Sequence, residues 1–376
     1  MAEIRSETKP GIEPLEMLLN MGPQHPSTHG VFRLVLWVDG EKIVDLEPHI
    51  GYLHRGSEKL CEGEQFHQVI TLFDRMDYIA NFNNEHAYCM AVEKLMGLEV
   101  PERAEYVRVI LCELNRIASH LVFVATMGLD AGAMTPSMIC FRGRERIQAL
   151  FEAVSGARMM HNYFRIGGLK EDLPENFDQL IAGLLPVVRK DVEEVDRLLT
   201  FNEIFLARLK DLGAISVEDA IDYGFTGPCL RACGVSSDLR KDEPYSVYDR
   251  FEFDVPVGLD GDCWDRFYVR VKEMYESLRI VQQAVEQMPQ GNVVSSLGRR
   301  LIRPPKGEVY TRSENPRGEL GVYLVSDGTD KPYRVKVRPP SYCNLSAIKH
   351  MLSGVWLADS VVTLGSLDIV LGEVDR

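Results

Sequence analysis

Long stretches in the middle of the chain repeat apolar residues at helical spacing. Within residues 267–288 the apolar positions alternate between steps of four and three residues, which is the a/d seam of a long packed helix. Residues 102–124 follow Pro101 and keep apolar side chains on one face and charged side chains on the others. Residues 177–201 are a third candidate, with a kink expected at Pro186. These spacings predict a helical bundle at the centre of the molecule.

The N-terminal part has a different pattern. Residues 31–38 and 42–46 are rich in β-branched and aliphatic residues and are separated by Asp39-Gly40, a strong hairpin signal, so two antiparallel strands are predicted there. Residues 48–56 then combine two glycines with basic and imidazole side chains. Such a mixture is typical of a loop built around a functional site.

The C-terminal part again predicts strands. Residues 308–310, 321–326 and 333–337 are expected to form short strands, followed by a helix over residues 346–352. A stretch rich in Gly, Pro and Arg over residues 289–305 is the best candidate for a domain boundary.

These patterns together predict an α+β fold that is mainly α, in four parts. We expect a mobile N-terminus over residues 1–17 and an antiparallel β unit with site loops over residues 18–60. A helical bundle is expected over residues 61–290 and a small β/α unit over residues 291–376. A chain of 376 residues is long enough for two or three such packed units.

Composition and charge narrow the function. The formal net charge of -14 and the dispersed Lys and Arg argue against nucleic acid as a partner. The longest apolar stretch, residues 120–133, is short and interrupted by Asp130, so no membrane-spanning segment is expected. The first fifteen residues contain no apolar stretch, so no secretory signal is expected and the protein should stay in the compartment where it is made.

The eight cysteines predict no cofactor. They are scattered, and only Cys229 and Cys233 lie close together, with three residues between them and no second pair nearby to complete a zinc or iron–sulfur pattern. We expect buried, reduced cysteines and no disulfides. No glycine-rich dinucleotide fingerprint is present, so any NADH or flavin is expected to bind elsewhere.

Several strings of residues match a known family. In chain order they are residues 20–30 (NMGPQHPSTHG), 51–56 (GYLHRG), 74–78 (DRMDY), 113–120 (ELNRIASH), 165–168 (RIGG) and 365–368 (GSLD). They resemble the D subunit of complex I-type NADH:quinone oxidoreductases, over the chain from about residue 18 to the last residue. An opening string of eleven residues is too long to match by chance.

The chain is also similar to the large subunit of nickel–iron hydrogenases, which hold nickel through two Cys-x-x-Cys motifs. The match rests on residues 74–76 and on Asp368, and it places Arg376 at the position of the final histidine ligand. The four matched thiolate positions hold other residues, Asp77, Ala80, Val370 and Glu373. Because a nickel–iron centre needs soft thiolate ligands, the resemblance implies a hydrogenase-like bundle without its metal, whose C-terminal unit returns to the vacated cavity.

The resemblance implies that a quinone headgroup fills that cavity and takes electrons from the terminal iron–sulfur cluster of an adjacent subunit. The matched headgroup ligands are His29 and Tyr78, and Asp130 matches the acid that orients the histidine and supports its positive charge. Imidazole and phenol suit the task because each can donate a proton to a quinone carbonyl. Without the resemblance, His29 would be taken as a turn residue and Tyr78 as a core aromatic. Asp130 in an apolar stretch should have a partner in either case.

Other residues in the matched strings are expected near the neighbouring cluster. Arg55 and Arg75 would favour its reduced form by their positive charge. Met160 stands where many relatives have a histidine, and a thioether cannot take up a proton, so proton-coupled tuning of the cluster at this position should be absent. The histidines outside the quinone site are expected to be mainly structural, namely His25, His49, His54, His86 and His120.

The resemblance also implies partners and a location. The chain would act only within a proton-pumping complex, a translocase on the cytoplasmic face of the cell membrane. Expected partners are the B-like, cluster-bearing small subunit, a C-like partner that pairs with it at its surface, and the H-like membrane protein that admits quinone. FMN, NADH and the iron–sulfur clusters would be held by other subunits, and this chain would bind no metal.

Two alternatives remain open at this point. One is the equivalent subunit of a quinone or methanophenazine reductase whose donor is reduced cofactor F420 or ferredoxin. The other is a non-catalytic scaffold of a hydrogenase-like membrane complex, against which the retained His29, Tyr78 and Asp130 argue.

Overall fold

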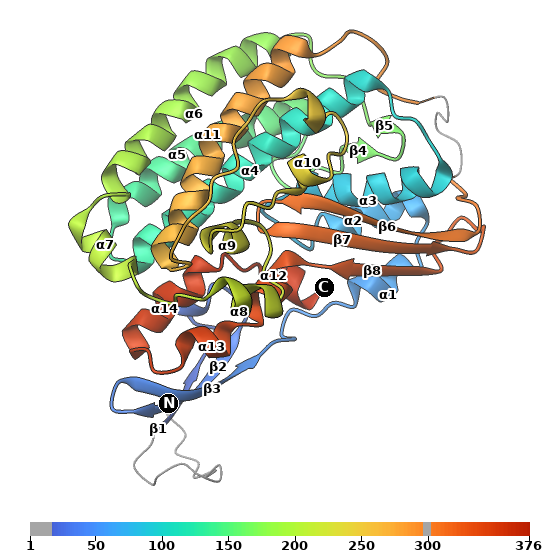
Figure 1. Cartoon of the computed structure of the whole chain (residues 1–376). Coiled ribbons are helices and arrows are strands. Elements are labelled where there is room, and N and C mark those ends of the chain that lie inside the picture. Colours follow the sequence, from blue (N-terminus) through green and yellow to red (C-terminus); the bar gives the residue numbers. More distant parts are fainter. Residues whose placement is uncertain (1–16, 296–301) are drawn as a thin grey trace.

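Four long helices form the body of the molecule. The computed structural model describes residues 17–295 and 302–376. Helices α4 (Glu102–Asp130), α5 (Met134–Ser155), α6 (Phe177–Leu199) and α11 (Cys263–Gln287) run side by side as a bundle (Figure 1). The predicted helices over residues 102–124, 177–201 and 267–288 are confirmed, and Pro186 lies inside α6. The expectation of a mobile start lies outside the described residues, except that Met17 begins a strand.

Helix α4 is the central element of this bundle. It follows Pro101 and has Glu102 and Glu105 in its first turn, where negative charge stabilises the positive end of the helix dipole. By length and composition it could cross a membrane, but 89% of its most apolar window is buried inside the protein. Its apolar character is therefore explained by packing on all sides within the fold.

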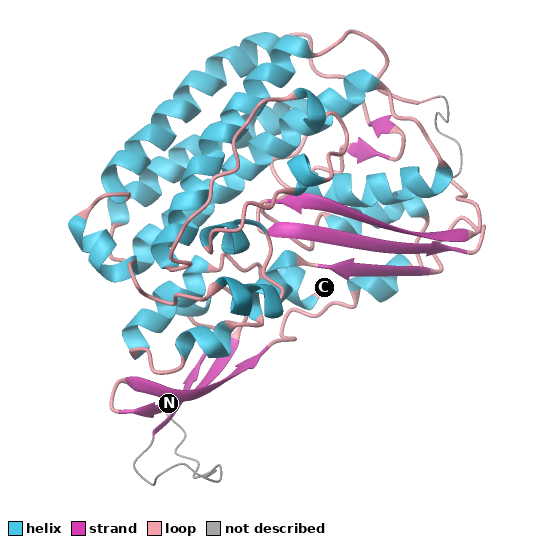
Figure 2. Cartoon of the chain, in the orientation of Figure 1, coloured by secondary structure: helices cyan, strands magenta, loops and turns pink. Residues whose placement is uncertain are grey.

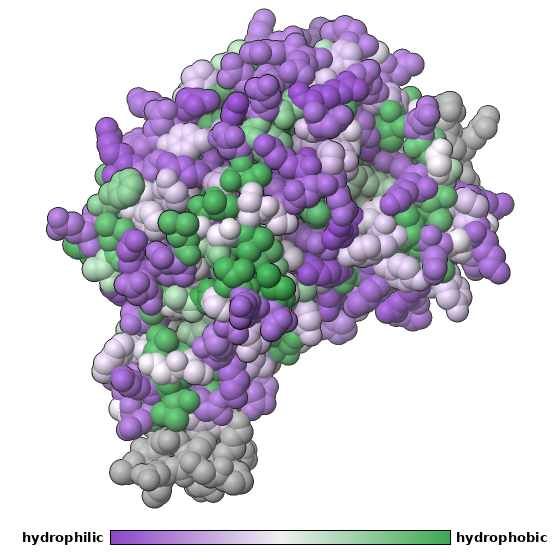
Figure 3. All heavy atoms as spheres, in the orientation of Figure 1, coloured by the Kyte–Doolittle hydropathy of each residue, from purple (hydrophilic) through white to green (hydrophobic). Residues whose placement is uncertain are grey.

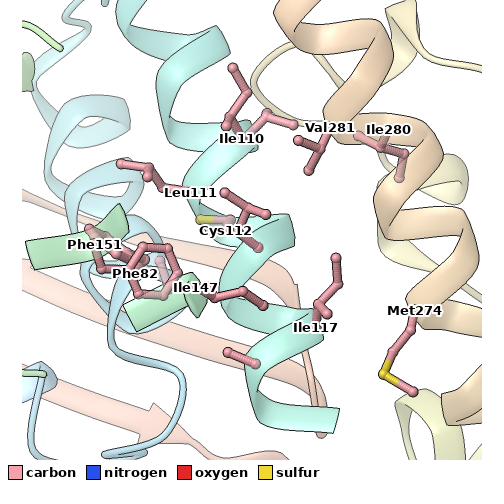
Figure 4. Packing of buried hydrophobic residues seen from close by; sticks show 14 of the residues in the cluster. Phe82, Ile110, Leu111, Cys112, Ile117, Ile147, Phe151, Met274, Ile280 and Val281 are labelled. Atoms are coloured by element: carbon pink, nitrogen blue, oxygen red, sulfur yellow. The ribbon is translucent and has the colours of Figure 1, made fainter. Parts of the chain in front are cut away.

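The core between α4 and its neighbours is built from interdigitating aliphatic and aromatic side chains. Figure 4 shows Ile110 and Ile117 of α4 facing Val281 and Met274 of α11. On another side, buried aromatic rings from α3 (Asn81–Met96) and α5 meet edge to face, as in the pair Phe82 and Phe151 with centroids 4.9 Å apart. The a/d seam predicted for α11 is buried from Phe267 to Val281, where α11 packs against α4 and α6.

Two antiparallel three-stranded sheets flank the bundle (Figure 2). The first has the order β1 (Met17–Met21), β2 (Arg33–Asp39), β3 (Lys42–His49), and the second has the order β6 (Gly307–Asn315), β7 (Gly318–Ser326), β8 (Arg334–Arg338). The predicted tight turn is confirmed, because Asp39 pairs with Lys42 and Gly40 has φ 61°. Strand β1 was not predicted as a separate element.

Short helices connect these parts. They are α1 (Ser57–Cys61), α2 (Phe66–Phe73), α7 (Glu203–Leu209), α8 (Val217–Asp222), α9 (Gly227–Ala232), α10 (Leu239–Asp242), α12 (Pro340–Leu345), α13 (Ile348–Leu352), α14 (Leu357–Ser366) and α15 (Leu371–Asp375), together with the 3-10 turns η1 (Pro26–Thr28) and η2 (Tyr248–Arg250). Helix α3 packs on β6 and β7. Among the C-terminal helices, α14 contacts α4, α13 contacts β3 and α12 contacts β7, so these helices lie between the bundle and both sheets (Figure 1). The surface seen in Figure 3 is largely hydrophilic, with apolar side chains gathered in its middle.

Some element boundaries differ from the sequence predictions. The part predicted as a helical bundle also contains the short strands β4 (Phe164–Arg165) and β5 (Gly168–Leu169). The predicted helix over residues 346–352 is wrong in its bounds, because α12 ends at Leu345 and α13 starts at Ile348. The Ser346 hydroxyl at this break lies 2.7 Å from each of the Tyr223 and Cys343 carbonyls and can donate to either, which offers the chain an alternative to helical hydrogen bonds.

The seam of α11 gives a direct test of core packing. Phe267 is fully buried, so Phe267→Ala should lower the free energy of unfolding by about 3–5 kcal/mol through lost burial and a residual cavity. Phe201 is 74% exposed, and Phe201→Ala should change it by about 0.5 kcal/mol or less. Denaturant unfolding of the purified chain measures both. Equal losses in the two variants would contradict the packing described.

Candidate functional site

His29 lies in a tight turn between β1 and β2. Its backbone is left-handed, with φ 54°, an unfavourable conformation that a surrounding structure must hold. The Thr28 hydroxyl makes contacts of 2.8 Å with the His25 carbonyl and 2.9 Å with the Gly30 carbonyl, which fixes the turn. A Cβ on Gly30 would come within 2.9 Å of the Leu371 side chain, so the turn packs directly against the C-terminal segment.

Asp130 is the last residue of α4 and meets the imidazole of His29. Asp130 Oδ2 lies 2.9 Å from His29 Nε2, and the two side chains are 16% and 17% exposed. The partner expected for Asp130 is therefore His29. A Cβ on Gly365 of α14 would lie 2.9 Å from Asp130 Oδ2 and 3.0 Å from His29 Nε2, so only glycine leaves room for this contact.

Tyr78 lies in the loop between α2 and α3, and polar side chains of α3 and α4 determine the shape of that loop. Asn81 Nδ2 donates to the Asp74 carbonyl at 2.6 Å, and Asn84 Nδ2 donates to the Asp77 carbonyl at 3.2 Å. From α4, Asn115 donates to the Ile79 carbonyl at 2.9 Å and accepts from the first turn of α3. The loop is therefore held from within the bundle.

The environment of Tyr78 favours a neutral phenol. The side chain is half-buried, and burial, followed by the negative charge of Asp77, raises the pKa of its hydroxyl. A Cβ on Gly372 of α15 would lie 3.2 Å from the ring and 2.6 Å from the Met76 carbonyl, so α15 packs directly on this loop. Within the described part of the chain, no side chain or backbone group is hydrogen-bonded to the hydroxyl of Tyr78, which leaves it available to an acceptor.

A buried guanidinium lies beneath this loop. Arg317 occupies the two-residue turn between β6 and β7 and is 1% exposed. Its Nη1 lies 2.7 Å from Asp77 Oδ2, and its Nη2 lies 3.1 Å from Asp368 Oδ1. It also donates to the Ser119 hydroxyl of α4 at 3.0 Å. One side chain thus joins the Tyr78 loop, α4 and the C-terminal segment.

Glu373 completes this buried group without a cation of its own. The Ser341 N–H donates to its Oε2, while its Oε1 is buried without a hydrogen-bond partner. Burial and the nearby charge of Asp77 raise the pKa of Glu373 to about 8. At neutral pH this carboxyl is therefore mainly protonated.

Two further predicted residues meet at the surface. The Arg55 guanidinium donates to the Arg75 carbonyl, so the loops that contain them are in contact, and both residues are exposed. His54 in the same loop contacts the Asp375 carbonyl through Nδ1 at 2.7 Å. These contacts place a positively charged surface beside the Tyr78 loop.

Met160 lies on the other side of the Tyr78 loop. Its backbone N–H donates to Asn81 Oδ1 at 3.3 Å, and its sulfur lies 3.4 Å from Asn81 Nδ2. Met160 thus contacts the asparagine that also holds the Asp74 carbonyl. Its backbone is left-handed, with φ 56°.

The C-terminal segment 365–372 contacts all three predicted site residues. His29 and Asp130 contact it at Gly365, and Tyr78 contacts it at Gly372. A cavity of about 560 Å³ between α3, β6 and the loop at Ser246 is lined by none of the three.

Sequence reasoning missed Arg317 and the spacing role of Gly365 and Gly372. The two glycines lie in or next to the matched terminal string, but nothing in the sequence around Arg317 indicates that its charge is buried.

Comparisons with known proteins show the family of the chain. The family model described as the respiratory-chain NADH dehydrogenase 49 Kd subunit matches residues 130–300 and 295–376. A protein from Dehalococcoides mccartyi, named as the D subunit of NADH-quinone oxidoreductase, is 54% identical over 360 residues, covering 96% of this chain and 98% of the relative. The chain belongs to the family of NADH-quinone oxidoreductase D subunits. Proteins with the same name from Carboxydothermus hydrogenoformans and Bacillus mycoides are 53% and 52% identical over the same shares of the chains.

Membership in the D-subunit family makes the chain part of an oxidoreductase complex. Over residues 17–295 and 302–376, no group of three His, Cys, Asp or Glu side chains is placed to hold a metal ion. The described cysteines are free and, except for Cys343, fully buried.

The carboxyl of Glu373 predicts a pH dependence of stability. The native carboxyl keeps its proton up to about pH 8, while the unfolded one loses it near 4.5, so its stabilising contribution is complete below pH 4.5 and is lost as pH rises through 8. In the wild type the free energy of unfolding should fall by up to about 1.4 kcal/mol per pH unit in this range, and Glu373→Gln should abolish this fall. Unfolding free energies between pH 5 and 9 measure it, with the exposed Glu152→Gln as control. The same decline in the Glu373→Gln variant would contradict this protonation state.

Proposed function

We propose that this chain forms the quinone-reduction site of a proton-pumping NADH-quinone oxidoreductase and passes electrons from a neighbouring subunit's terminal iron–sulfur cluster to quinone. The observation that supports it most directly is the contact of 2.9 Å between His29 and Asp130, which the space at Gly365 permits. Tyr78, whose hydroxyl is available, packs against the same C-terminal segment at Gly372.

The chemistry of these side chains fits the reaction. Reduction of a quinone to a quinol takes two electrons and two protons, one proton for each carbonyl oxygen. His29 in its protonated form would donate one proton, and Tyr78 would donate the other. After His29 gives up its proton, Asp130 remains as a carboxylate whose charge is no longer balanced. That change of charge at the end of α4 is a signal that neighbouring membrane subunits could use for proton pumping.

The buried charges beneath Tyr78 support the view that a metal site has been replaced. Asp77 and Glu373, at two of the positions matched to hydrogenase thiolates, interact with each other, and the guanidinium of Arg317 contacts Asp77. A fixed organic cation thus takes the place that a metal ion would have in the hydrogenase-like fold. Such a site can neutralise carboxylates but cannot exchange electrons, which leaves redox chemistry to the bound quinone.

The surroundings suggest where partners bind. Exposed Arg55 and Arg75 would face the cluster-bearing small subunit, where positive charge favours the reduced cluster. Beside Asp130, the exposed apolar side chains Leu129, Met134 and Met138 would face the quinone tail and the membrane subunit. In this arrangement the chain lies on the cytoplasmic face of the cell membrane, and FMN and NADH are held by other subunits.

Removal of the Tyr78 hydroxyl tests the donor. Tyr78→Phe keeps the ring and its packing, so the complex should assemble, but quinone reduction should fall by about 30-fold to 1000-fold because a donor worth about 2–4 kcal/mol is lost. Electron transfer from NADH to an artificial acceptor should be unchanged. Tyr333→Phe, at a 67% exposed tyrosine, serves as the control. Quinone reduction at the wild-type rate in Tyr78→Phe would exclude Tyr78 as a headgroup ligand.

A double-mutant cycle tests the pairing of His29 with Asp130. If the two act as one unit, His29→Ala, Asp130→Asn and the double variant should lower the quinone-reduction rate by similar factors, because effects of jointly acting residues are not additive. Steady-state rates of the three purified complexes provide the measurement. Strictly multiplicative losses would show that the residues act separately.

A further inference from the structure

Two buried carboxyl groups that are not among the proposed quinone ligands are bound by the same loop, next to the Tyr78 loop. Asp74 follows the last turn of α2, and Glu85 lies on the second turn of α3. Both residues are fully buried. Neither forms a salt bridge with an Arg or Lys among the described residues, unlike Asp77, which pairs with Arg317.

The backbone of a single loop holds one oxygen of each carboxyl. The Asn162 N–H donates to Asp74 Oδ2 at 3.2 Å, and the next two N–H groups, of Tyr163 and Phe164, donate to Glu85 Oε2 at 2.9 and 2.7 Å. Three consecutive backbone donors thus bind the pair. They come from the loop that also contains Met160.

The second oxygen of each carboxyl is available to share one proton. Asp74 Oδ1 and Glu85 Oε1 are buried, and no N–H or hydroxyl of the described residues donates to them. The two carboxyls are close enough for each to change the pKa of the other. Because an ionised carboxylate can only accept, a hydrogen bond between two carboxyls requires a proton on one of them.

The charged and titratable groups around the pair do not replace this proton. Arg75 and Arg165 act on Asp74 from a distance, and the Arg165 guanidinium is bound to the Asn162 and Phe164 carbonyls. On the adjoining helices, Glu93 is paired with Arg108 and Glu113 with Arg116, so these charges are balanced by each other. The nearby thiols and imidazoles are uncharged, because burial raises the pKa values of the thiols and lowers those of the imidazoles: Cys89, Cys112, His86 and His161.

The direction of the pKa shifts agrees with this geometry. Burial raises the pKa of Asp74 to about 6, and burial together with the Asp74 charge raises the pKa of Glu85 well above its ordinary value. Near neutral pH the pair therefore holds one proton, on Glu85, and Asp74 accepts the hydrogen bond.

We propose that Asp74 and Glu85 form a buried site for one exchangeable proton and that this pair positions the Tyr78 loop for quinone reduction. The second half of the proposal rests on the proposed function. Asp74 opens the loop that contains Arg75 and Tyr78, and its carbonyl accepts from Asn81, which also binds the Met160 backbone. Loss of the proton would place two carboxylates in contact inside the protein, and the loop from Met160 to Phe164 would have to move to separate them. Both residues are positioning residues, since neither would touch quinone.

Infrared spectroscopy of the assembled complex without quinone tests the shared proton. Glu85→Gln has the same shape and keeps a donor toward Asp74. It should remove one protonated-carboxyl C=O band at pH 7.5, a band that shifts in deuterated water. The exposed Glu152→Gln should remove none. Asp74→Asn should keep the band but shift its frequency, because the acceptor changes from carboxylate to amide. An unchanged carboxylic-acid region in Glu85→Gln, or an unshifted band in Asp74→Asn, would overturn the shared proton.

Quinone reduction in the same complexes tests the positioning role. Asp74→Asn removes the carboxyl that titrates near pH 6 and leaves the pair uncharged, so kcat should fall several-fold with little change in KM, and the pH profile should lose the step that the wild type shows near pH 6. A wild-type rate and pH profile in Asp74→Asn would overturn the positioning role whatever the infrared bands show. A wild-type complex without quinone reductase activity would instead refute the proposed function, and the infrared result would still decide the proton site.

Discussion

The buried guanidinium of Arg317 is the interaction on which the site depends. It contacts Asp77 beside Tyr78, Asp368 in the C-terminal segment and Ser119 of α4, three parts of the chain that are far apart in sequence. Burial of a charge is costly unless partners compensate it, so the three segments can come together only in the arrangement that surrounds this side chain. The position of Tyr78 and the room at Gly365 and Gly372 both follow from that arrangement.

A second network of buried, mutually compensated charges lies within the bundle. Glu113 of α4 binds Arg116 and Arg240, and it also accepts from the hydroxyls of Tyr248 and Ser277. Burial alone would raise the pKa of Glu113, but the two guanidinium groups outweigh it and lower the value to about 2. The network fixes α4 against α11 and β6 by directional contacts rather than by apolar packing alone. The matched string over residues 113–120 is thus explained by polar side chains that point inward.

The sequence was most informative where a pattern is local. The heptad seam of α11, the Asp39-Gly40 turn and the strands other than β1 in the two larger sheets follow from spacing and turn chemistry, and the structure confirms them. It was less informative for the ends of the C-terminal helices, because packing between distant segments determines where α12 stops and α13 begins. Residue spacing alone did not indicate that residue 29 would meet residue 130.

For the site residues, too, contacts between distant segments could not be predicted from local patterns. His29, Tyr78 and Asp130 were identified only through long matching strings, and their roles in quinone reduction stay predictions, although the structure places His29 beside Asp130. The shared proton of Asp74 and Glu85 could not be predicted at all. A carboxyl about ten residues from another has no special meaning in a sequence, and only the fold shows that one loop binds both.

The placement of the C-terminal segment has a consequence for biogenesis. Because Gly365, Asp368 and Gly372 fill the space between His29, Arg317 and Tyr78, the site cannot take shape while residues 365–376 are still inside the ribosome. The N-terminal turn and the Tyr78 loop are made early and must wait, partly formed, for the last part of the chain. A subunit truncated before residue 365 would therefore lack the segment that contacts His29, Arg317 and Tyr78.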